Sequence, residues 1–215
     1  MTLEESAALL GEILKSSRHT VFFGGAGVSV ESGIPDFRSV DGLYNTKWKY
    51  PPETVLSHSF FESHTEEFYE FYREKMIALW AKPNPAHKRL AEWERAGKAV
   101  SIVTQNIDGL HQAAGSQVVY ELHGSVHRNR CMECGKLYDV HAVADCEGIP
   151  HCTCGGIIKP DVVLYEEALD GYTLQGAVNA IQNADLFIVA GTSLTVYPAA
   201  GLVEYYRGDR MVLIN

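Results

Sequence analysis

The stretch that decides the fold is "VFFGGAGVSVESGIPDFRS", residues 21–39. It opens with a short apolar run that ends in glycines, which predicts a buried strand leading into a tight turn. Glycines at such a turn let the backbone approach a pyrophosphate, whose charge is held by free N–H groups at a helix start. The candidate phosphate-binding residues are therefore Gly25, Ala26 and Gly27, and the alternative is a tight strand-to-helix turn alone. A second interruption, "SGIPDFRS", predicts a loop where a dinucleotide-binding fold would continue into a long helix.

Further apolar runs predict a parallel sheet. Strands are expected at residues 20–25, 99–106, 118–124, 184–193 and 211–215, and helices at 2–15, 86–97 and 171–184. Because strands alternate with helices, the fold class is α/β, with a Rossmann-like parallel sheet covered by helices on both faces.

Two segments break this alternation and predict insertions. Residues 37–85 are helical and aromatic-rich, and residues 128–158 contain every cysteine. We therefore expect a Rossmann-like domain from residues 1–36, 86–127 and 159–215, a helical insertion at 37–85 and a small zinc-binding domain at 128–158.

The paired cysteines predict a structural zinc site. Cys131 and Cys134 form a CxxC pair, and Cys152 and Cys154 follow as a CxC pair. This nearly matches the two-knuckle spacing of zinc ribbons, with one residue missing from the second pair. Four thiolates fill a tetrahedral site and leave no position for water, so one structural zinc ion per chain is expected.

Two alternatives for the cysteines stay open. His141 or His151 could replace a cysteine as ligand, or the thiols could be free or redox-active. Cys146 stands outside both pairs and is expected to be a bystander.

Composition narrows the class of protein and its partners. The chain has 18 basic and 27 acidic residues, a net charge of −9, which argues against nucleic acid and is compatible with a lysine-bearing peptide. No run of 18 apolar residues and no secretory signal is evident, so we expect no membrane association. An odd number of cysteines without a secretory signal favours a reducing, cytoplasmic location.

Polar residues follow three of the predicted strands. Because the carboxyl ends of parallel strands share one edge of a sheet, ligands bind there. The side chains expected to converge with the glycine turn are Gln105, Asn106, Asp108 and His123, and Gly191, Thr192 and Ser193 could line a phosphate or ribose. His123 is the candidate base, since imidazole has a suitable pKa. His111 is expected to be structural.

Two segments near the domain junction are candidates for binding a peptide. One contains Val162, Val163, Leu164 and Tyr165, and the other is "GTSLTVYPAAG" (191–201), which contains Val196. A peptide could add as a strand between them, and the alternative is a plain β-ribbon.

Taken together, these features resemble the sirtuin family of NAD-dependent protein deacylases, of the bacterial type. The matching motifs, in the family's order, are "GAGVSVESGIPDFRS", "TQNIDGLH", "ELHGS", the four paired cysteines, "KPDVV", "GTSL" with "VYPAAG", and "VLIN". The resemblance implies an enzyme that transfers the acyl group of acyl-lysine to ADP-ribose and releases nicotinamide. Its cofactor would be NAD, and its partners would be acyl-lysine-containing proteins or peptides.

The resemblance also implies roles for individual residues. His123 would take a proton from a ribose hydroxyl, and Asn106 would position the ribose or a water. The remaining implied NAD contacts are Gly25, Ala26, Gly27, Val30, Asp36, Phe37, Arg38, Gln105, Ile107, Asp108, Gly191, Thr192, Ser193 and Asn215. Val30 stands where the family often has a small hydroxyl residue, which removes one phosphate contact.

The resemblance bears on acyl choice as well. Family members that remove acidic acyl groups carry Tyr and Arg three positions apart in the helical insertion. Here "YEFYREK" (69–75) places Arg73 one position out of step with Tyr69. A helix turns about 100° per residue, so Arg73 would point elsewhere, and we expect acetyl and other neutral acyl groups over succinyl.

Three other functions share parts of this pattern. An NAD-dependent oxidoreductase would carry an acidic residue about 20 positions after the glycines at a strand end, where this chain has the loop-like "DGLYNTKW" (41–48). A module that reads acyl-lysine or ADP-ribose without turnover is disfavoured by the intact His123 and Asn106. Mono-ADP-ribosyl transfer shares the first chemical step and stays open.

Overall fold

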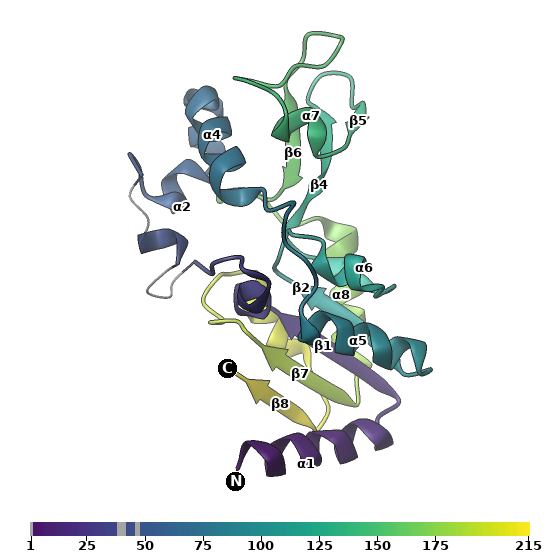
Figure 1. Ribbon diagram of the computed structural model, residues 1–215. Coiled ribbons are helices and arrows are strands. Elements are labelled where there is room, and N and C mark those ends of the chain that lie inside the picture. Colours follow the sequence, from purple (N-terminus) through teal and green to yellow (C-terminus); the bar gives the residue numbers. More distant parts are fainter. Residues whose placement is uncertain (1, 38–41, 46–47) are drawn as a thin grey trace.

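The computed structural model describes residues 2–37, 42–45 and 48–215. Figure 1 shows a sheet lobe, which carries both chain ends, and a smaller lobe that contains α2, α4, α7 and the strands β4 to β6.

The sheet lobe is built on a five-stranded parallel sheet with the order β3-β2-β1-β7-β8. Its strands are β1 (His19–Gly24), β2 (Ala99–Thr104), β3 (Val119–Glu121), β7 (Leu186–Ala190) and β8 (Met211–Ile214). All five predicted strands are confirmed. The chain moves outward from β1 through β2 to β3 and then returns to the other side of β1. This reversal is the switch point at which ligands bind in open α/β sheets.

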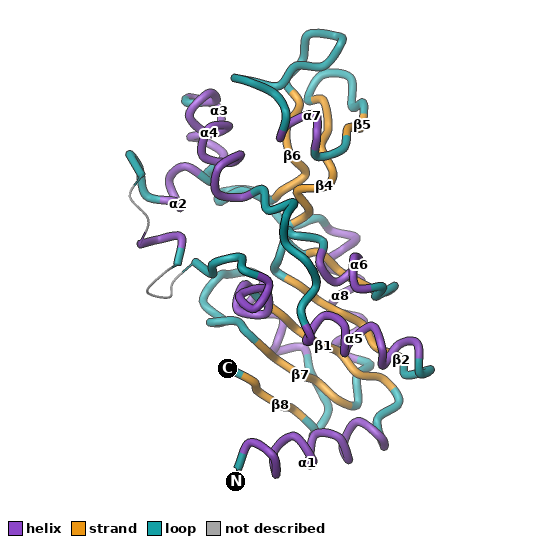
Figure 2. Tube along the Cα trace, in the orientation of Figure 1, coloured by secondary structure: helices purple, strands orange, loops and turns teal. Residues whose placement is uncertain are grey.

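Helices cover both faces of the sheet because side chains alternate across each strand. Phe22 packs in a cluster with residues of α1 (Leu3–Ser16) and α5 (Pro85–Arg95). The next residue, Phe23, packs with residues of α8 (Gly171–Gln182) and η4 (Ala199–Tyr205). Figure 2 shows the helices on either side of these strands. The three helices predicted from the sequence are thus present as α1, α5 and α8.

The two predicted insertions form the small lobe together. Its three-stranded antiparallel sheet has the order β5-β4-β6. The elements of this lobe are η2 (Leu43–Asn45), α2 (Pro52–Val55), α3 (His58–Ser63), α4 (Thr65–Phe71), the π-helical turn η3 (Tyr72–Met76), β4 (Gly124–Cys131), β5 (Leu137–Tyr138), α7 (His141–Ala144) and β6 (Ile158–Val162). The sheet extends beyond residues 128–158 on both sides, because β4 and β6 continue to the junction with the sheet lobe.

One hydrophobic core joins both insertions. Phe61, Phe68 and Tyr69 of the helical segment cluster with Val126 and Ile158 of the small sheet. Within the described ranges, none of the helices is both long and apolar enough for a membrane crossing.

Asp185 connects the end of α1 to the sheet. Its carboxylate accepts hydrogen bonds from Ser17 Oγ at 2.6 Å, Arg18 N at 2.9 Å and His19 N at 3.1 Å. Desolvation opposes ionisation, but these hydrogen bonds prevail and lower the pKa of Asp185 to about 2.

We predict that Asp185→Asn lowers the free energy of unfolding near neutral pH by about 1 kcal/mol, as expected for hydrogen bonds to a charged but partly exposed group. Because the folded pKa is depressed, this contribution is present above the ordinary Asp pKa of 3.8 and is lost as the pH falls towards about 2. Urea denaturation at several pH values measures it. The control is Asp209→Asn, whose carboxylate is 97% exposed. Equal stability of D185N and the parent at pH 7 would contradict the prediction.

Candidate active site

A cleft of about 420 Å³ lies where β1, β2 and β7 end. The predicted site residues that line it are Gly25, Ala26, Gly27, Asp36, Phe37, Gln105, Asn106, Ile107, Asp108, His123, Val162, Val163, Leu164, Tyr165, Gly191, Thr192, Ser193, Val196 and Asn215. The structure therefore brings the glycine turn, the polar strand ends and both candidate peptide-binding segments to one cleft.

Two glycine turns pack directly against each other at this cleft. Gly27 N donates to Gly191 O at 2.9 Å. A Cβ atom on Gly27 would lie 2.8 Å from Gly191 Cα, and one on Gly25 would lie 2.8 Å from Thr192 Cβ. Only glycine allows this backbone approach.

The chain leaves the first glycine turn through η1 (Ala26–Ser32), a short 3₁₀ helix that ends at Gly33 with φ +86°. The sequence predicted such an interruption in place of a long helix. Ala26 is the first residue of η1 and lines the cleft. Gly25 N and Gly27 N donate to Ala190 O and Gly191 O, whereas Ala26 N has no acceptor among the described residues, so the Ala26 N–H can face an anionic phosphate.

Hydrogen bonds fix the polar side chains at the ends of β1 and β2. Asn106 Nδ2 donates to Ser29 Oγ at 3.0 Å, and Ser29 Oγ donates to Asp108 Oδ2 at 2.6 Å. Gln105 Nε2 donates to Thr192 Oγ1 at 2.9 Å, which links β2 to the second glycine turn. Since Asn106 uses its amide N–H for Ser29, its carbonyl oxygen can accept a hydrogen bond from a ligand.

His123 is held in one tautomer. Its Nδ1 lies 3.0 Å from Gln105 O. A carbonyl oxygen can only accept, so Nδ1 carries the proton and Nε2 keeps its lone pair. Burial lowers the pKa of His123, although the bond to Gln105 O opposes this, so the ring is neutral at pH 7. A neutral imidazole with an available Nε2 in a cleft can act as a general base.

His111 has a different setting. Its side chain is 1% exposed and packs against Phe22 and His87. Burial lowers the pKa of His111 to about 3. It does not line the cleft, which fits the structural role expected from the sequence.

The segment that follows β6 connects the two lobes across the cleft. Val163 N donates to His123 O at 3.0 Å, and Tyr165 N donates to Leu56 O at 2.9 Å. The Tyr165 hydroxyl also lies 2.9 Å from that of Tyr44.

The four paired cysteines form a separate cluster. Their sulfur atoms all lie within 4.8 Å of one another, and Cys131 Sγ is 3.4 Å from Cys154 Sγ. Tetrahedral zinc with Zn–S bonds of about 2.3 Å separates its sulfur ligands by about 3.8 Å, so the donor set fits one zinc ion. Hydrogen bonds from Cys154 N and Tyr138 Oη lower the pKa of Cys152 to about 5, which favours the thiolate that a metal binds.

The histidines near this cluster have other partners. His151 Nδ1 lies 3.0 Å from Gly155 O, and His141 Nδ1 lies 3.0 Å from an Asp145 oxygen. Neither belongs to the group of four sulfurs, and Cys146 also lies outside it.

The chain is similar to known proteins over almost its whole length. The model of the Sir2 family matches residues 25–198. A protein from Clostridium acetobutylicum, named NAD-dependent protein deacetylase, is 61% identical, with 100% of this chain and 89% of that protein covered. A protein of the same name from Clostridium tetani is 59% identical, with 96% of this chain and 85% of that protein covered. The chain belongs to the Sir2 family.

Solved Sir2 structures have the same fold. One, described as "Structural Basis for the Mechanism and Regulation of Sir2 Enzymes", is 44% identical with a TM-score of 0.87 and covers 99% of this chain and 87% of its own. Another, described as "Sir2-p53 peptide-NAD+", is 41% identical with a TM-score of 0.85 and covers 100% of this chain and 87% of its own. The expected fold class, a Rossmann-like sheet domain with a small four-cysteine domain, is confirmed for this Sir2-family chain.

Two of the expected NAD contacts are not part of the described cleft lining. Val30 does not line the cleft, and its side chain is 46% exposed. Consecutive residues of a 3₁₀ helix are a third of a turn apart, so the neighbouring Ser29 lines the cleft with Ala26, three positions before it. Arg38 lies outside the described residues.

Sequence reasoning missed several residues that line the cleft, among them Ser29, Tyr44, Lys75 and Glu167. The three-residue spacing from Ala26 could have identified Ser29. Lys75 comes from the π-helical turn η3, which no periodic pattern in the sequence indicates.

We predict that the purified protein contains one zinc ion per chain and that Cys152→Ser or a strong chelator removes it. Because Cys131 and Cys152 belong to the core that joins the insertions, the small lobe should then lose its cooperative structure. Elemental analysis and hydrogen exchange of residues 124–162 measure both effects. Cys146→Ser is the matched control and should retain the metal. A metal-free parent with a protected small lobe would contradict the prediction.

Proposed function

We propose that this chain is an NAD-dependent protein-lysine deacetylase that transfers the acetyl group of acetyl-lysine to ADP-ribose and releases nicotinamide. The observation that carries the proposal is His123, a cleft-lining imidazole whose Nδ1 proton points at Gln105 O and whose Nε2 has no partner among the described residues. The names of the Clostridium relatives and the peptide and NAD+ in a similar solved structure support it.

Three cleft residues would carry out the chemical steps. When bound, NAD would supply the ribose carbon that gives up nicotinamide and the ribose hydroxyl oxygen that finally carries the acyl group. His123 would take a proton from a ribose hydroxyl at Nε2, and the Asn106 carbonyl oxygen would orient that hydroxyl or a water. Phe37 shields the reacting carbon from water, which would otherwise compete for it.

Binding is divided between the other parts of the cleft. The turn formed by Gly25, Ala26 and Gly27 would hold the phosphates, with the Ala26 N–H as the donor that has no acceptor among the described residues. The ribose and carboxamide are assigned to Gln105, Ile107 and Asp108, and the adenosine half to Thr192, Ser193 and Asn215. Residues 162–165 and Val196 hold the acyl-lysine peptide.

We also propose a cytoplasmic location. The four cysteines are free thiols arranged for a metal, a state that a reducing compartment preserves. Cell fractionation tests this directly.

We predict that His123→Ala lowers kcat/KM for NAD-dependent deacetylation at least ~100-fold, the scale of a positioned general base. Chromatographic detection of nicotinamide and O-acetyl-ADP-ribose, with an acetyl-lysine peptide, measures the rate. The control, His19→Ala, removes an exposed histidine outside this cleft. Because burial lowers the pKa of His123, the acidic limb of the parent's pH profile should lie below the ordinary histidine value of 6.5.

Two outcomes would contradict the proposal. Equal rates for H123A and the parent would remove His123 from its role. Nicotinamide release that does not require the acyl-peptide, with ADP-ribose found on protein, would favour mono-ADP-ribosyl transfer.

Acyl preference follows from the cations near the cleft. Arg73 does not line it, and Arg73 Nη1 donates instead to Gly148 O at 2.8 Å. Among the described cleft residues, Lys75 is basic, and its Nζ is paired with a Glu74 oxygen at 2.8 Å. Among the described residues, a succinyl carboxylate that enters the cleft would therefore find no cation that is free to pair with it.

We predict that kcat/KM for an acetyl-lysine peptide exceeds that for the matched succinyl-lysine peptide at least ~10-fold, because an unpaired carboxylate would be desolvated. Lys75→Met should leave this ratio unchanged. Faster desuccinylation by the parent, lost in K75M, would show that Lys75 binds a carboxylate and that the prediction is wrong.

A further inference from the structure

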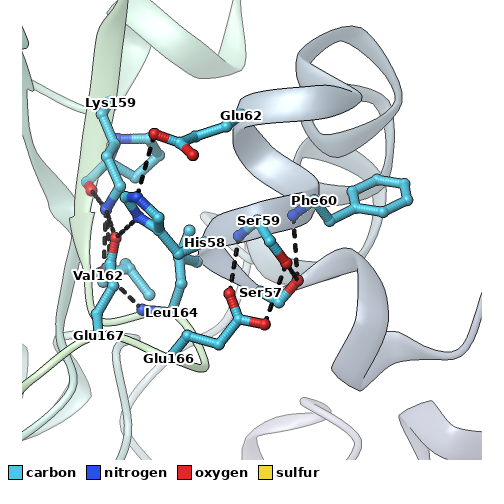
Figure 3. A network of polar contacts seen from close by, with 11 residues as sticks. Ser57, His58, Ser59, Phe60, Glu62, Lys159, Val162, Leu164, Glu166 and Glu167 are labelled. Atoms are coloured by element: carbon cyan, nitrogen blue, oxygen red, sulfur yellow. Dashed lines mark hydrogen bonds and ion pairs between the residues drawn. The ribbon is translucent and has the colours of Figure 1, made fainter.

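Residues 162–167, the substrate segment, are attached to α3 by a network of polar contacts (Figure 3). The centre of the network is the Glu167 carboxylate. It accepts a hydrogen bond from Leu164 N at 2.9 Å, contacts Lys159 Nζ at 3.2 Å and lies 2.9 Å from His58 Nδ1. The backbone of the substrate segment is thus fixed by the side chain of its own last residue.

His58 is the first residue of α3 and lies between two carboxylates (Figure 3). Its Nδ1 faces Glu167, and its Nε2 lies 3.3 Å from a Glu62 oxygen. A neutral imidazole has one N–H and can donate to only one of them, whereas a protonated one donates to both. The charged groups facing His58 are Glu62 on its own helix and Glu167 and Lys159 from the other side.

The backbone at the start of α3 holds the same segment. His58 N donates to Tyr165 O at 3.0 Å. Ser59 N and Ser59 Oγ donate to the Glu166 carboxylate at 2.9 and 3.0 Å. Glu166 has φ +76°, a conformation that favours glycine, so these contacts help to hold an otherwise unfavourable backbone.

We propose that Glu167 is a positioning residue for the peptide substrate and that His58 makes this positioning dependent on pH. The inference rests on the proposed function, which assigns the peptide to the substrate segment. Glu167 acts through the backbone of Leu164, and the neighbouring Tyr165 carbonyl is held by His58 N. The charge on His58 therefore changes the peptide site, while the glycine turns of the cofactor site are unaffected.

The direction of the pH effect follows from the contacts. The hydrogen bond to Glu167 raises the pKa of His58 above its usual value, although desolvation opposes it. A raised folded pKa means that the double contact is complete below the ordinary histidine value and is lost as the pH rises through the folded value. Peptide binding should therefore weaken on the alkaline side of neutrality.

Steady-state kinetics over a pH series test the proposal. In the parent, the KM for an acetyl-lysine peptide should rise about three- to tenfold between pH 6.5 and 8.5, the scale of a charge-assisted hydrogen bond at a half-exposed site. The KM for NAD should not follow it. His58→Gln should give a raised peptide KM that no longer varies in this way.

Two further variants sharpen the test. Glu167→Gln keeps an oxygen that Leu164 N–H can bond but loses the charge that His58 and Lys159 require, so its peptide KM should be raised at every pH. The matched control is His141→Gln. His141 makes an exposed i, i+4 contact to Asp145 at 3.0 Å outside the cleft, and its loss should leave the parent's pH profile unchanged.

A second readout does not depend on catalysis. In an NMR titration of the parent, the amide signals of Leu164 and Tyr165 should shift with the same midpoint as the His58 ring proton, and they should not do so in H58Q. If the parent has no deacetylase activity but these amide signals shift with the His58 midpoint, the proposed function is overturned and the positioning network is retained. If the parent is active, its peptide KM varies with pH as in H58Q, and the amide signals do not shift with the His58 midpoint, the inference alone is overturned.

Discussion

The backbone contact between two glycine turns is the constraint on which the rest of the site depends. Gly27 N reaches Gly191 O because neither turn carries a Cβ at the point of contact. From there, one series of contacts leads to the candidate base. Thr192 follows Gly191 and accepts from Gln105, and Gln105 O fixes the ring of His123. A side chain added at the turns would displace the polar groups of β2 and the imidazole together.

The small lobe supplies the opposite wall of the cleft. Its helical and cysteine-bearing parts are distant in sequence but share one core, in which Cys131 and Cys152 pack with Phe61 and Phe68. Zinc in such a cluster would act on the cleft indirectly. It would close the small sheet, and that sheet supports both the helical insertion and the start of the substrate segment.

Local patterns predicted the parts of the structure that depend on local chemistry. Each strand of the five-stranded sheet lies in an apolar run, and the glycine turn and cysteine pairs are readable from spacing alone. Contacts between polar residues that are distant in the sequence produce no local pattern from which they could be predicted. His58 and Glu167 are 109 positions apart, and neither lies in a periodic pattern. The sequence pointed to Val30 as a cofactor contact, whereas the neighbouring Ser29 lines the cleft. The reason is that the segment after the turn is a 3₁₀ helix, which the sequence did not reveal.

The contacts of the substrate segment also limit how a peptide can pair with it. The N–H groups of Val163, Leu164 and Tyr165 donate to His123 O, the Glu167 carboxylate and Leu56 O. The carbonyls of Leu164 and Tyr165 accept from Glu167 N and His58 N. Among the described residues, this leaves Val163 O without a partner, so a full strand ladder is not available to a peptide at residues 163–165. A segment with so few free groups must be held accurately, and directional bonds to a carboxylate achieve this better than apolar packing does.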